Sequence, residues 1–112
     1  MTEHLNWTKE EFKVFLLLYA AQTNFFETQE EIEFIESRFP NEIINKIRKQ
    51  TNKLNDYEKS KIIVNQIKSN EYTQSDLDAI LAEIKELYKS DGKFDSLEQS
   101  IFSMLNRLLK IN

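Results

Sequence analysis

The sequence predicts an all-α fold, a compact single-domain bundle of about six helices, from three observations. Apolar residues recur three and four positions apart along most of the chain, which is the spacing of one helix face. The 112 residues include one glycine and one proline, so there is little material for turns between strands. Residues able to cap a helix also stand before each apolar run.

The first two predicted helices each open with a capping box, a Ser or Thr followed three residues later by a Glu or Gln. Thr8 and Glu11 open a helix over about residues 9–23, and Thr28 and Glu31 open the next. The first helix is apolar on nearly every side. We therefore expect it to lie at the centre of the domain.

A proline then separates the second predicted helix from a third. The residue before a proline is disfavoured in the α conformation, whereas proline itself suits the first turn of a helix. We therefore expect Pro40 to form a corner, followed by a helix with Ile43, Ile44 and Ile47 on its inner face.

Three further helices are predicted in the second half of the chain. Asn55 caps a helix over about residues 56–69, and Thr73 caps one over about residues 74–90 that Gly92 ends. The last helix starts near Asp95 and has Glu98 in its first turn.

The two ends of the chain follow the same plan when one is shifted by 67 residues. Each has a helix exit, a short loop, a polar cap, a glutamate three residues later and then an apolar stripe. The pairs under this shift are Asn24 and Asp91, Thr28 and Asp95, Glu31 and Glu98, Phe34 and Ile101, and Ile35 and Phe102. We therefore expect two pseudo-repeated helix-loop-helix units within one domain.

Composition limits the classes of protein to consider. The chain has no cysteine, which excludes disulfides and thiolate chemistry, and its start has neither a basic region nor an apolar run. No apolar stretch approaches the length of a membrane span. We expect residues 1–112 to form one cytoplasmic domain with residues 1–7 frayed, and no membrane span.

The charge of −4 is distributed unevenly along the chain. Residues 40–70 have seven basic and three acidic side chains, whereas both flanking segments are acidic. A basic middle could contact phosphates, but nucleic-acid domains are usually basic as a whole. We expect a solvated helix face and no nucleic-acid partner, and whether this segment meets an acidic partner stays open.

A family resemblance adds to this prediction. Asp91-Gly92 with Glu98, and the ending Leu105-Asn106-Arg107-Leu108-Leu109, resemble the tellurite-resistance TerB family, which is similar to the N-terminal domain of the DjlA co-chaperone. The likeness spans most of residues 9–110, with Tyr19-Ala20-Ala21 and Glu31 as the first copy. It implies an all-helical fold, a stress-resistance role and paired acidic loops suggested to bind metal. Asn24 and Phe25 replace the first Asp-Gly, so one carboxylate of that surface is missing.

The remaining acidic loop, Asp91-Gly92, shares some features with a calcium-binding loop. If Gly92 takes the sixth position, Asp91, Asp95 and Glu98 fall on ligand positions, whereas Leu87 and Lys89 fall on two others. Because calcium takes about six to eight oxygens, this set is too small for tight binding. We therefore predict no metal or cofactor and interpret Asp95 and Glu98 as helix caps, with a weak divalent-metal-binding protein as the alternative.

The sequence offers little for catalysis, and we predict no enzyme. The sole imidazole, His4, lies near the N-terminus, and no nucleophile motif or glycine-rich phosphate loop occurs. Two adjacent aromatic residues, Phe25 and Phe26, lie in a polar loop, where an exposed ring could anchor a partner. The hypothesis is a helical interaction module of the stress-resistance type, which docks a protein through Glu31, Asp91, Asp95, Glu98, Phe25 and Phe26.

Overall fold

The computed structural model describes residues 7–22, 28–69, 72–90 and 96–109. Regular structure in these residues is entirely helical and comprises six helices. They are α1 (Lys9–Gln22), α2 (Gln29–Arg38), α3 (Asn41–Thr51), α4 (Asp56–Ser69), α5 (Gln74–Lys89) and α6 (Ser96–Leu108). The α-carbon radius of gyration is 13.2 Å, the value expected of a folded chain of this length. The predicted all-α fold is confirmed.

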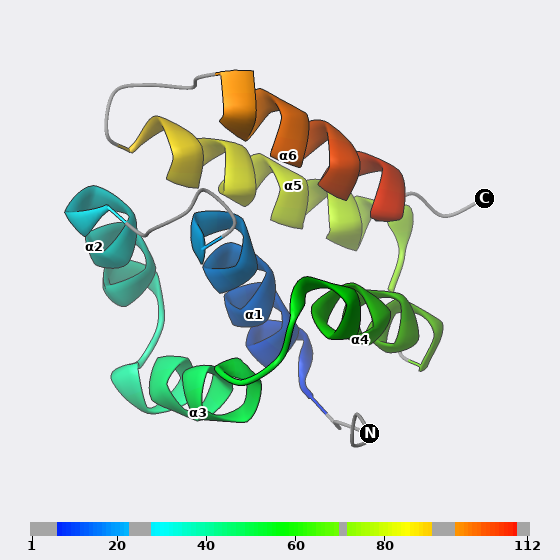
Figure 1. The fold of residues 1–112 in the computed structure, drawn as a ribbon, viewed down its shortest axis with the longest axis horizontal. Helices are drawn as coiled ribbons and strands as arrows, with labels where there is room; N and C mark the ends of the chain where they lie inside the picture. Colours follow the sequence, from blue (N-terminus) through cyan, green and yellow to red (C-terminus); the bar gives the residue numbers. More distant parts are fainter. Residues whose placement is uncertain (1–6, 23–27, 70–71, 91–95, 110–112) are drawn as a thin grey trace.

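Helix α1 lies at the centre, as its nearly continuous apolar sequence predicts (Figure 1). Ten of its 14 residues are buried, and it packs against α2, α3, α4 and α5. Helices α5 and α6 cover one side of α1, and α3 and α4 lie on the other. The three largest of the fully buried side chains, Tyr88, Phe12 and Phe15, come from α5 and α1.

The predicted caps form at the helix starts that can be described. The Thr28 hydroxyl accepts from the Glu31 N–H at 3.1 Å, and the Glu31 carboxylate accepts from the Thr28 N–H at 3.0 Å. Equivalent reciprocal pairs join Thr8 with Glu11, Asn55 with Glu58, and Thr73 with Asp76. Each pair satisfies amide groups that a helix leaves without an internal partner.

Pro40 forms the expected corner, as the N-cap residue of α3 rather than its first helical residue. Its backbone is extended, with φ −62° and ψ 141°, and its carbonyl accepts from the N–H groups of Ile43 and Ile44. The helix break therefore comes from the residue preceding proline, and the proline carbonyl starts the next helix.

Helices α1 and α5 pack with their chains running in the same direction. Three side-chain contacts advance together along both helices: Lys9 with Asp76, Lys13 with Glu83, and Ala20 with Tyr88. The paired residues are 67, 70 and 68 positions apart. The first helices of the two predicted units therefore meet at nearly equivalent positions.

None of the described helices combines the length and the apolar character that crossing a lipid bilayer requires.

Candidate functional site

The two glutamates of the predicted acidic surface are buried. Glu31 is 0% exposed and Glu98 is 1% exposed, although each stands in the first turn of its helix. Glu31 closes the capping box with Thr28. In this structure neither residue is exposed to solvent, and the expected docking surface as a whole stays a prediction. Their matched burial follows the 67-residue shift.

The other residues of that surface lie outside the described part of the chain. These are Asp91, Asp95, Phe25 and Phe26. Within the described residues, no group of three His, Cys, Asp or Glu side chains is placed to hold a metal ion. The divalent-metal alternative, which needs Asp91 and Asp95 beside Glu98, stays a prediction.

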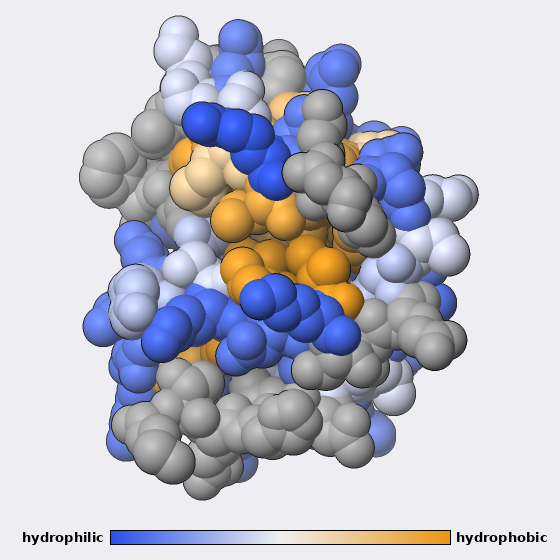
Figure 2. All heavy atoms as spheres, turned by 90° about the vertical axis from the view of Figure 1, so that its right-hand side faces the viewer, coloured by the Kyte–Doolittle hydropathy of each residue, from blue (hydrophilic) through white to orange (hydrophobic). Residues whose placement is uncertain are grey.

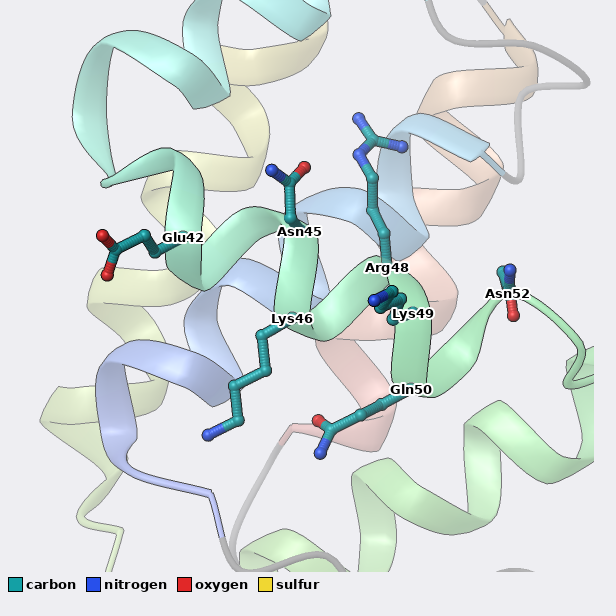
Figure 3. Close-up of a pocket in the computed structure, with 7 residues that line it drawn as sticks. All are labelled: Glu42, Asn45, Lys46, Arg48, Lys49, Gln50 and Asn52. Carbon is teal, nitrogen blue, oxygen red and sulfur yellow. The ribbon is translucent and has the colours of Figure 1, made fainter.

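A surface depression lies along the outer face of α3. It has a volume of about 720 Å³, and its lining residues are Glu42, Asn45, Lys46, Arg48, Lys49, Gln50 and Asn52. All come from α3 or the residue after it, and Figure 3 shows their side chains spreading in different directions. A small-molecule site needs polar groups that converge on a concave space. This depression is therefore a solvated basic face.

A more distinctive surface lies on α4. Tyr57 is 66% exposed, and among the described residues it is the one large hydrophobic side chain that lies mostly in solvent. It shares a face of α4 with Lys61, Asn65 and Lys68, all exposed and spaced four, four and three residues apart. We call these four residues the α4 stripe. The Lys61 ammonium lies 5.1 Å from the centre of the Tyr57 ring.

An apolar surface is visible on the side of the molecule where α4 faces the α5 and α6 layer. Figure 2 shows hydrophobic atoms in a hollow there, flanked by hydrophilic side chains. Helical spacing puts the half-buried Val64 and Ile67 of α4 next to the α4 stripe. Met104 and Leu108 are among the half-buried apolar residues of α6. Apolar and basic surfaces are therefore adjacent on α4.

The α4 stripe was missed because each of its residues alone is ordinary for a helix surface. The available signal was the spacing of Tyr57, Lys61 and Lys68 on the outer face of the predicted helix over residues 56–69. An aromatic residue at an outward position is the feature that could have revealed it.

One buried carboxyl group, that of Glu11, has a lowered pKa. The Lys46 ammonium, which donates to Glu11 Oε2, and the Thr8 N–H together hold the pKa of Glu11 below its ordinary value of 4.5. The Glu11 residue is buried, whereas the Lys46 side chain is half exposed. The ionised carboxylate therefore stabilises the folded chain.

We expect this carboxylate to produce a pH-dependent contribution to stability. Because its pKa is lower in the folded chain, the contribution is complete well above pH 4.5 and is lost as the pH falls through the folded pKa. Glu11→Gln can still cap the helix but removes the charge that pairs with Lys46, so it should cost up to about 1 kcal/mol at pH 7, the range of a partly exposed ion pair. Urea unfolding at pH 7, 5, 4 and 3 should show this difference shrinking toward acid, with exposed Glu42→Gln as the control. A cost independent of pH would contradict the assignment.

Comparison with known proteins gives no relative from which to argue. Neither a protein-family model, nor a curated protein, nor a solved structure matches this chain.

Proposed function

We propose that this chain is a non-enzymatic interaction module that binds a protein partner, with the α4 stripe as its docking face. The observation that supports the proposal is the exposure of Tyr57, 66% of which is in contact with solvent. Tyrosine is among the residues that contribute most to binding when a partner covers them. Its ring is rigid, so little conformational entropy is lost on docking.

The charge of the stripe indicates an acidic partner. Lys61 and Lys68 take part in none of the ion pairs formed among the described residues. The exposed carboxylate of this helix, Asp56, lies at its start and is not part of the α4 stripe. Two cations on one face attract an acidic segment and raise its association rate.

The neighbouring apolar hollow suggests the shape of the partner. A helix with one apolar and one acidic side could place its apolar side against the hollow and its carboxylates against the stripe (Figure 2). Helix α4 has 14 residues, which corresponds to a length of about 21 Å. A partner helix of three to four turns would match that length.

The resemblance to the TerB family is part of the same proposal. It suggests an accessory protein in resistance to tellurite or another stress, and it implies the duplicated helix-loop-helix plan. The parallel packing of α1 on α5 and the burial of both Glu31 and Glu98 support that plan. The partner surface differs from the one that the acidic loops suggest, because those two glutamates face inward.

The test is capture of partners from a lysate of the source organism by the immobilised chain, with each captured protein quantified. Tyr57→Ala should reduce capture of the specific partner on the order of 30-fold, since a binding hot spot contributes about 2 kcal/mol. Lys61→Glu should reduce it at least as much, because a like charge then faces the acidic partner. Neither change should shift the melting temperature by more than a degree or two, because both side chains are exposed.

Two controls locate the docking face. Lys49→Glu makes the same charge change on the exposed face of α3 and should leave capture nearly unchanged. Asp91→Ala tests the acidic loop, and loss of capture in this variant alone would place docking there instead. Capture of nucleic acid, abolished by nuclease treatment, would show that the basic stripe serves another class of partner.

A further inference from the structure

A second concave surface lies on the seam between α1 and α5. It has a volume of about 420 Å³, within the range of small-molecule sites. Unlike the depression on α3, it is bounded by several elements, since both helices line it together with Phe39 and Tyr72. Its apolar lining comes from those two rings and from Ala79 and Ile80. We call it the α1–α5 cleft.

The charged groups that line the α1–α5 cleft balance one another. Lys9 and Lys13 contribute two positive charges, and Glu10 and Asp76 contribute two negative ones. Both lysines are already paired across the seam, Lys9 with Asp76 at 3.1 Å and Lys13 with Glu83 at 3.3 Å. An ionic ligand would have to compete with these pairs and would gain no net attraction from the lining. The balance favours an uncharged ligand.

Tyr72, one of the lining residues, has an unused hydrogen-bond donor. The residue is 7% exposed, and its hydroxyl is buried with no hydrogen-bond partner in the structure. Burial, and then the nearby Asp76 carboxylate, raise the pKa of Tyr72 to about 12, so the phenol keeps its proton at neutral pH. A buried donor without an acceptor costs about 1–3 kcal/mol. An acceptor atom brought by a ligand would remove that cost.

We propose that the α1–α5 cleft binds a small uncharged amphipathic molecule. Its flat apolar body packs against Phe39 and Ile80, and its carbonyl oxygen accepts from the Tyr72 hydroxyl. The assignment is independent of the docking face on α4, because Tyr57 and Lys61 do not line the cleft.

Three probes of nearly equal shape test this assignment: benzamide, benzoate and benzylamine. Titration of the ¹⁵N-labelled chain by NMR should show benzamide shifting amide signals of residues 9–13 and 75–80, with a dissociation constant of about 1–10 mM, as expected for so small a molecule. Benzoate and benzylamine, charged at neutral pH, should bind at least fivefold more weakly. Tighter binding by either one would overturn the choice of an uncharged ligand.

Tyr72→Phe has two expected effects that a purely structural role would not combine. Removing the unpartnered hydroxyl should raise the melting temperature of the free chain by a few degrees, while benzamide binding weakens about fivefold, the equivalent of one hydrogen bond. Tyr57→Phe, an exposed counterpart, should do neither. Ala79→Leu keeps the hydroxyl but fills the cleft and should abolish binding. Unchanged affinity in both cleft variants, or no shifts at the named residues, would refute the proposal.

Discussion

Replacing Phe15 by alanine should lower the free energy of unfolding by about 3–5 kcal/mol, the usual cost of deleting a buried aromatic ring. Phe15 is buried in α1, the helix against which α2, α3, α4 and α5 pack. Its ring centre lies 4.9 Å from that of Trp7 and 6.2 Å from that of Tyr19. Domains of this size are stable by about 5–15 kcal/mol, so the variant should be close to unfolding.

Urea denaturation followed by far-ultraviolet circular dichroism measures this cost. Phe15→Leu should fall between the native chain and the alanine variant, because it restores part of the lost volume. Tyr57→Ala removes an exposed ring and should change stability by about 0.5 kcal/mol or less. Equal costs for the buried and the exposed aromatic residue would contradict the central place of α1.

The helices could be predicted from the sequence because their signals are local. A capping box joins residues three positions apart, and an apolar stripe depends on neighbours three and four positions away. The predicted helix over residues 56–69 agrees with α4, and the one over residues 74–90 extends one residue past α5. The end of the first predicted helix falls on Thr23, outside the described residues.

The candidate sites were harder to predict from the sequence. They depend on which face of each helix start the rest of the domain covers. A glutamate in a first helical turn stabilises the helix whether it is exposed or buried. The sequence therefore indicated a cap at Glu31, but only the packing of α2 determined that its carboxylate faces inward. The α1–α5 cleft depends likewise on contacts such as Lys9 with Asp76, which are 67 residues apart.

The duplicated helix-loop-helix plan differs from these local signals, because it is a long-range prediction made from the sequence alone. Two copies of one plan pack most simply when equivalent elements meet, and α1 and α5 do so in parallel. The shift of 67 residues separates Lys9 from Asp76, and a shift of 68 separates Ala20 from Tyr88. The contacts between α1 and α5 are therefore in keeping with the predicted repeat, although the sequence did not indicate which helices would form the central seam.

Tyr88 is the second position where we expect a large effect, because it joins the two units at this seam. Its side chain is fully buried, and its hydroxyl donates to the Ala20 carbonyl at 2.7 Å. Tyr88→Ala removes the ring and the hydrogen bond together and should cost about 4–5 kcal/mol. Tyr88→Phe keeps the ring and should cost about 1 kcal/mol.

The difference in the free energy of unfolding between these two variants separates the contribution of ring packing at the seam from that of the hydrogen bond. Native-state hydrogen exchange would add the spatial information, because loss of the seam should raise exchange in α1 and α5 together. If the two units instead open independently, Tyr88→Ala should increase exchange in α5 and α6 while α1 stays protected. That second pattern would contradict the tie between the units, because it would mean that α1 holds its structure through α3 and α2 without α5.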